Sequence, residues 1–147
     1  MNRGRKDRRR VRKEKKRRKK IALLCTRKKQ CQIIKIIMTN PELIELIDEL
    51  RALPKENEWV EFKTGNVTTN DKLGQYISGL SNAACIANQA FAYLVFGIND
   101  ETHQAVGTNF NFKNRKEGNE ELELWIRRFL SPSIKFDHFV CDYGTNH

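Results

Sequence analysis

The chain has 147 residues and a formal net charge of +10, and 39% of its residues are hydrophobic. This length suits one domain rather than two, and no apolar run reaches the roughly 18 residues that a membrane span needs. The four cysteines show no CxxC spacing and no nearby His ligands, which argues against a zinc site and favours a soluble, cytoplasmic protein with reduced thiols.

The positive charge is concentrated in residues 1–37. This segment holds 18 Lys and Arg against only Asp7 and Glu14, a net charge of +16, whereas residues 38–147 hold 10 basic and 16 acidic residues, a net charge of −6. Like charges at the density of residues 1–20 repel one another, and the basic extension 1–37 is therefore expected to be disordered.

Three interpretations of residues 1–37 remain open. The segment could be a nucleic-acid-binding arm or a nuclear localisation signal, or it could lie outside the native coding sequence. Met38 would be a natural start, because Thr39 or Asn40 can cap a helix whose first turn contains Pro41. The apolar run 21–25 is too short for a signal peptide, whose core takes about 7–15 residues.

The first part of the remaining chain predicts two helices around a short strand. Apolar residues recur at helical spacing over 43–53, where Pro54 ends the pattern. Residues 58–63 alternate between polar and apolar, as in a half-buried strand. A loop over 65–70 then leads, with Thr69 or Asn70 as cap, into a second helix over 73–87.

The rest of the chain predicts strand, turn, helix and strand. The nearly continuous apolar run 92–98 suits a strand that is buried on both faces. A turn and a short return strand follow over 99–107, then a third helix over 122–130 and an alternating strand over 134–140. Residues 143–147 have the composition of a hairpin turn.

Two stretches carry a resemblance to a known family. The first is Glu-Asn-Glu-Trp-Val-Glu-Phe-Lys at 56–63; the second, within 80–108, contains Ala87-Asn88, Gly97-Ile98-Asn99-Asp100 and Val106-Gly107. Their order and spacing resemble the Schlafen AlbA-type domain, and the chain is also similar to bacterial proteins described as transcriptional regulators that carry this domain. The resemblance implies an α+β fold, with a mixed β-sheet and packed helices, for residues 38–147.

The sequence departs from the family pattern at its glycine pair and at its end. Phe91-Ala92 stands where relatives have Gly-Gly, and relatives continue with another strand beyond Gly144, so the domain is expected to be incomplete at its C-terminus. The chain also lacks the Gly-x-x-x-x-Gly-Lys-Ser/Thr loop, which leaves an ATPase or helicase activity without support.

The resemblance also implies a catalytic site. Schlafen ribonucleases cut RNA with three carboxylates and a divalent metal, and the matching residues here are Glu56, Glu61 and Asp100. Clustered carboxylates bind Mg²⁺ or Mn²⁺, which can activate water. The alternative is that these are surface charges, one of which pairs with Lys63 for less than about 1 kcal/mol.

The candidate nucleic-acid-binding residues are basic side chains that could contact phosphate: Lys63, Arg115, Lys116, Arg127 and Arg128. The alternative is that these basic side chains are solvated surface charges without a ligand. Trp59 and Trp125 are predicted to be core residues because they lie on apolar faces. The predicted function is nucleic-acid binding, to DNA or RNA, in a regulator-type protein. The alternatives are a metal-dependent endoribonuclease and a protein-interaction module or homodimer that pairs through exposed strand edges.

Overall fold

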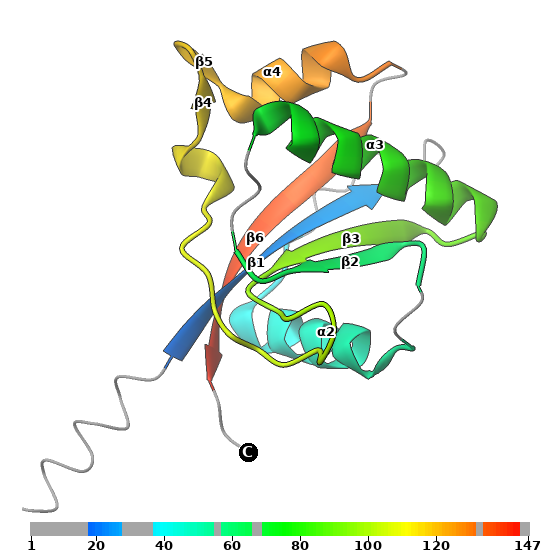
Figure 1. Cartoon of the computed structure of the whole chain (residues 1–147), viewed down its shortest axis with the longest axis vertical. Coiled ribbons are helices and arrows are strands. Elements are labelled where there is room, and N and C mark those ends of the chain that lie inside the picture. Colours follow the sequence, from blue (N-terminus) through cyan, green and yellow to red (C-terminus); the bar gives the residue numbers. More distant parts are fainter. Residues whose placement is uncertain (1–17, 28–36, 55–56, 66–68, 132–133, 145–147) are drawn as a thin grey trace, which may run out of the picture.

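In the part of the chain that the structure describes, the fold combines a four-stranded sheet with three α-helices, a short 3-10 helix and a small hairpin. The computed structural model describes residues 18–27, 37–54, 57–65, 69–131 and 134–144 (Figure 1). The elements in chain order are β1 (Arg18–Arg27), α2 (Asn40–Ala52), β2 (Val60–Lys63), α3 (Asn70–Ile86), β3 (Phe91–Phe96), η1 (Phe112–Asn114), β4 (Lys116–Glu117), β5 (Glu120–Glu121), α4 (Leu122–Phe129) and β6 (Lys135–Gly144). The predicted α+β class is confirmed. None of the described helices is long and apolar enough to cross a membrane.

The main sheet is mixed, as predicted. Its strand order is β2-β3-β1-β6, with β2 parallel to β3 and with β1 antiparallel to both β3 and β6. Helix α2 covers one face of the sheet, and α3 and α4 cover the other (Figure 1). Strand β6 pairs through one side only among the described elements. An edge of this kind can pair with another chain, so the homodimer stays a prediction.

Strand β1 corrects the prediction for the basic extension. Residues 18–27 were expected to lie in a disordered segment; instead they form a strand in the interior of the sheet, where Ala22 pairs with Phe96 on one side and Val140 on the other. The reason is the apolar run 21–25, which is buried on both faces of the sheet. The free energy gained by burying these side chains is large enough to keep the basic residues beside them in the strand. Residues 1–17 and 28–36 lie outside the described part of the chain.

The helix boundaries follow the sequence signals closely. At the start of α2, the carboxylate of Glu42 accepts hydrogen bonds from the Thr39 N–H at 2.6 Å and from the Thr39 hydroxyl at 2.7 Å, an arrangement that satisfies free donors at a helix N-terminus. Thr69 caps α3, because its hydroxyl accepts from the N–H of Lys72 at 3.2 Å. Asn88 lies just after α3 with φ +54°, where it turns the chain as a residue following a helix often does.

The core consists of two layers, one on each face of the sheet. The layer under α3 and α4 includes Leu24, Ile77, Leu94 and Phe96, and the layer under α2 includes Leu23, Ile47 and Val95. Trp59 and Trp125 are partly buried against these layers, as predicted.

The C-terminal strand is longer than the sequence pattern suggested. A hairpin turn was expected from Tyr143, but β6 continues through Gly144, and Tyr143 is buried and bonded to Asp48 and Arg51 of α2. The predicted turn was wrong for Tyr143 and Gly144, because the hydroxyl of Tyr143 is hydrogen-bonded to α2 and keeps this end of the chain in the strand. Residues 145–147 lie outside the described part.

The segment after β3 returns close to the sheet without forming a full strand. Gly97 has φ +95°, and its carbonyl accepts from the N–H groups of Val106 at 2.8 Å and Gly107 at 2.9 Å. The return strand expected near 105–107 consists of a single bridge between Ile98 and Ala105.

Candidate functional site

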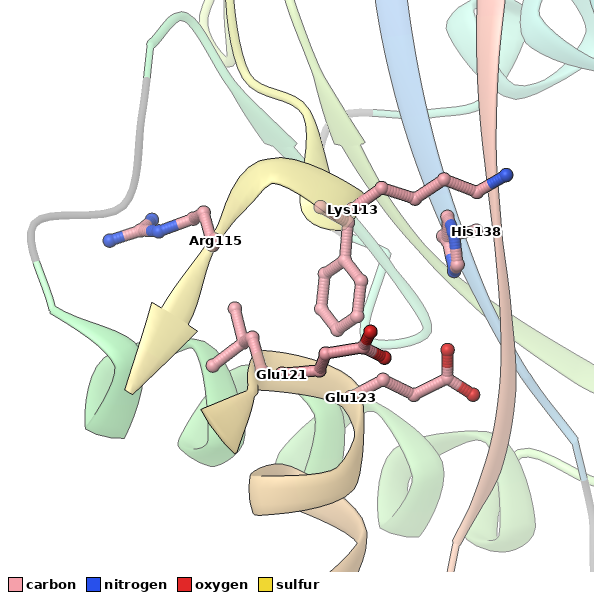
Figure 2. A pocket seen from close by; sticks show the side chains of 7 residues that line it. Lys113, Arg115, Glu121, Glu123 and His138 are labelled. Atoms are coloured by element: carbon pink, nitrogen blue, oxygen red, sulfur yellow. The ribbon is translucent and has the colours of Figure 1, made fainter. Parts of the chain in front are cut away.

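A cavity lies between η1, the start of α4 and strand β6. It measures about 250 Å³ and is lined by Phe112, Lys113, Arg115, Glu121, Leu122, Glu123 and His138 (Figure 2). Three segments that are separate in sequence supply this lining. The fold therefore gathers charged side chains at a place that no single stretch of sequence marks.

Local hydrogen bonds hold the segment that carries Arg115. The side chain of Asn111 accepts from the N–H of Lys113 at 3.1 Å and caps η1. Beyond it, β4 and β5 form a hairpin that turns at Gly118, whose φ is +58°. The side-chain amide of Asn70, at the start of α3, donates to the carbonyl of Lys116 at 3.1 Å. The hairpin is thereby fixed to α3 beside the cavity.

His138 contributes a buried polar atom to the cavity. Its ring lies 5.0 Å from the ring of Phe112, and its Nε2 has no hydrogen-bond partner among the described residues. Burial is the largest influence on its pKa and lowers it, despite the opposing charges of Glu123 and Asp137. The imidazole is therefore neutral at neutral pH, with one donor and one acceptor nitrogen.

The formal charges around the cavity balance. Lys113 and Arg115 contribute two positive charges, and Glu121 and Glu123 contribute two negative ones. Figure 2 shows Lys113 and Arg115 extending in opposite directions, with both carboxylates on the side of Lys113 and His138. The cavity therefore offers both donors and acceptors, which suits a polar group with mixed hydrogen bonding better than an isolated phosphate.

Two of the predicted nucleic-acid-binding residues on α4 are already paired with acids. Arg127 donates to Glu123 through Nη2 at 2.9 Å and through Nε at 3.1 Å. The Nη2 of Arg128 lies 2.8 Å from the Oε2 of Glu120. Because Glu123 lines the cavity, Arg127 adjoins it through that carboxylate.

The other three predicted basic residues lie in two places. Arg115 lines the cavity, and its guanidinium is 5.7 Å from the ring centre of Phe110; Lys116 is exposed on β4. Lys63, on β2, pairs with Glu61, and its Nζ lies 4.9 Å from the ring centre of Tyr76. Burial by itself lowers the pKa of Lys63, but its contacts with Glu61 and Tyr76 outweigh burial and raise it.

The predicted catalytic carboxylates are not brought together among the described residues. Glu56 lies outside the described part. Glu61 is on the α3 face of the sheet, with Lys63. Asp100 is exposed in the turn after β3, which packs on the α2 side, where the carbonyl of His103 accepts from Arg51 Nε at 2.6 Å. In the part of the chain that the structure describes, no group of three His, Cys, Asp or Glu could hold a metal ion. That search does not include Glu56, and the three-carboxylate site stays a prediction.

Most residues of the cavity were not foreseen from the sequence. Arg115 was predicted to bind nucleic acid, but Lys113, Glu121 and Glu123 were not singled out, and His138 was assigned no role. The alternation over 134–140 places His138 on the same face as Phe136, which is a weak signal that it points toward the helices rather than to solvent.

Comparison with known families agrees with the resemblance in the sequence. A family model described as Schlafen, AlbA_2 matches residues 56–146, which is more than half of the chain. Strand β1 and helix α2 lie before the matched region. No curated protein and no solved structure matches the chain significantly.

Proposed function

Because this chain belongs to the Schlafen AlbA_2 family, a domain type that suggests a nucleic-acid-associated function, we propose that it is a nucleic-acid-binding domain of a regulator-type protein. The partner is DNA or RNA. The single observation that supports this beyond the family is the attachment of the basic segment: it continues directly into β1, which is hydrogen-bonded on both sides within the sheet.

The charge distribution explains why this attachment matters. Residues 1–17 hold 11 Lys and Arg and two acids, a net charge of +9, whereas residues 18–147, which include β1, carry only +1. Lys and Arg bind nucleic acid by neutralising phosphates and releasing their counterions. Because β1 is fixed in the sheet, nucleic acid bound by the basic residues that precede Arg18 would be tethered to the folded domain.

The segment from η1 to β4, beside the cavity, supplies a second set of cations. Lys113 and Lys116 are exposed, and Arg115 lies between them. Phosphate contacts position a nucleic acid, while groups with donors and acceptors read its bases. The mixed lining of the cavity suits contacts with bases. To contact phosphate, Arg127 and Arg128 of α4 would first have to release the carboxylates of Glu123 and Glu120.

Titration with salt tests the proposal on the full chain. Binding of a labelled single-stranded oligonucleotide, followed by fluorescence anisotropy, should weaken with rising salt, with a slope of log K against log salt of about −0.7 for each neutralised phosphate. Replacing Arg8, Arg9 and Arg10 by Gln should reduce that slope by about two units. The matched control replaces Gln30, Gln32 and Asn2 by Ser and should leave the slope unchanged. Absence of binding at about 50 mM salt, or a slope of zero, would contradict the proposal.

A further inference from the structure

A second cavity lies on the α2 side of the sheet, where the end of α2 meets the start of β3. It measures about 220 Å³ and is lined by Leu46, Glu49, Leu50, Leu53, Trp59, Gln89, Ala90, Phe91 and Tyr93. Three of these side chains are aromatic, and each is only partly buried. They pack against the core layer under α2 and also line this cavity.

The three rings stand at angles to one another. The ring centres of Trp59 and Tyr93 are 6.2 Å apart with planes tilted by 58°, and those of Phe91 and Tyr93 are 6.4 Å apart with a tilt of 43°. The backbone holds the two strands that carry Trp59 and Tyr93 together, because the N–H of Tyr93 donates to the carbonyl of Trp59 at 2.9 Å. The three aromatic side chains therefore line one cavity in different orientations.

The electrostatics of this cavity favour a cation. The faces of aromatic rings are negative and attract ammonium groups, and Glu49 is the sole ionised side chain in the described lining. Burial, followed by the charges of Cys25 and Glu49, raises the pKa of Tyr93 to about 12, so its ring stays a neutral phenol. No basic residue in the described lining competes for the rings.

The surroundings indicate where such a cation would come from. Helix α2 exposes four acids, and its one basic residue, Arg51, is partly buried and paired with Asp48. The exposed acids are Glu42, Glu45, Asp48 and Glu49. This surface would repel the phosphate that accompanies a lipid headgroup or a nucleotide, and it would attract a basic peptide. The cavity is also smaller than the roughly 300–1,000 Å³ of pockets for drug-sized ligands, so it suits one side chain.

We propose that the cavity formed by Trp59, Phe91, Tyr93 and Glu49 binds the alkylammonium side chain of a lysine from a basic protein segment, with a preference for its N-methylated forms. The rings surround the cation and Glu49 supplies the opposite charge. Methyl groups increase the contact with the rings and lower the cost of removing water from the ammonium group. The proposal is independent of nucleic-acid binding.

The test follows Trp59 fluorescence in the full chain carrying Trp125→Phe, which leaves Trp59 as its one tryptophan. Three probes are titrated: acetyl-lysine amide, acetyl-trimethyllysine amide, and the neutral isostere of the latter with carbon in place of the quaternary nitrogen. We expect saturable quenching by trimethyllysine, with an affinity about fivefold or more above that of the isostere, and weaker binding of lysine.

Two substitutions on the exposed surface of α2 complete the test. Glu49→Gln should weaken trimethyllysine binding several-fold, whereas Glu45→Gln, at a residue that is exposed on the same helix but does not line the cavity, should not.

A third variant removes one of the rings. Trp59→Leu, followed by NMR of the methyl protons of the ligand, should abolish binding, and circular dichroism shows whether that variant stays folded. Equal affinity for the neutral isostere, or no saturable signal, would overturn the proposal.

Discussion

The basic side chains of the domain differ in what already neutralises them. Arg127 and Arg128 are held by Glu123 and Glu120, and Lys63 is held by Glu61. Partly exposed pairs of this kind contribute about 1 kcal/mol or less, so a phosphate can compete for them. Their positive charge is nonetheless offset in the free protein, which makes the segment before β1 the main source of attraction for a polyanion.

His138 should give the stability of the protein a dependence on pH. Its pKa in the folded state lies below the ordinary value of 6.5, chiefly because of burial. The unfolded state therefore binds more protons in the window just below pH 6.5, and stability that is fully present above that pH is lost as the pH falls. Urea unfolding at pH 5 and pH 7 should show this loss, and His138→Gln should reduce it.

A neighbouring variant provides the control for His138. Lys135 is exposed on the same strand and does not line the cavity, so Lys135→Gln should retain the full difference between the two pH values. An unchanged difference in His138→Gln would show that other groups cause it.

At the scale of elements, most of the fold could be predicted, but strand β1 and the short elements η1, β4 and β5 could not. The three helices and strands β2, β3 and β6 follow from apolar spacing and from caps such as Thr69. Strand β1 was missed because ten basic or polar neighbours dominate the composition around the run 21–25. Five consecutive apolar residues are also what a strand buried on both faces requires, so the signal was present but was outweighed by charge.

The sites were harder to predict than the elements for a physical reason. The lining of the first cavity comes from η1, α4 and β6, and that of the second from α2, β2 and β3 together with its preceding loop. Spacing in the sequence cannot show which of these segments meet. Arg115 was identified by its charge alone, whereas the neutral His138 and the rings near Tyr93 needed the packing of the helices on the sheet.

Substitutions in β1 test its place in the fold. Leu24 is 1% exposed and belongs to the layer under α3 and α4. Leu24→Ala should lower the free energy of unfolding by about 2–5 kcal/mol, as for other buried leucines. Leu124→Ala, at a position that is 57% exposed, should change it by about 0.5 kcal/mol. Chemical denaturation measures both, and equal small effects would mean that residues 18–27 lie outside the folded core.

At the scale of the whole molecule, the metal-nuclease prediction depends on carboxylates that are separated in the sequence, Glu56, Glu61 and Asp100. It requires the full chain to cleave structured RNA in Mn²⁺ but not in EDTA. Glu61→Ala should then reduce cleavage by more than the roughly 10- to 100-fold that loss of an outer-sphere partner costs a metal site. Glu58→Ala, an exposed acid nearby, should cleave like the parent. Gel analysis of the RNA decides between these outcomes, and a parent that leaves RNA intact ends the hypothesis.

The interior position of β1 has a consequence for how the protein reaches its native state. The pairing of β1 with β6 places Arg18 opposite Gly144, and these two residues are separated by most of the chain. Contacts between such distant residues slow folding, because a long loop must close before they form. Of the four strands in this sheet, β1 is synthesised first and β6 last, so the apolar residues of β1 lack that partner until β6 has been made. We expect nascent chains to need protection from aggregation during that interval.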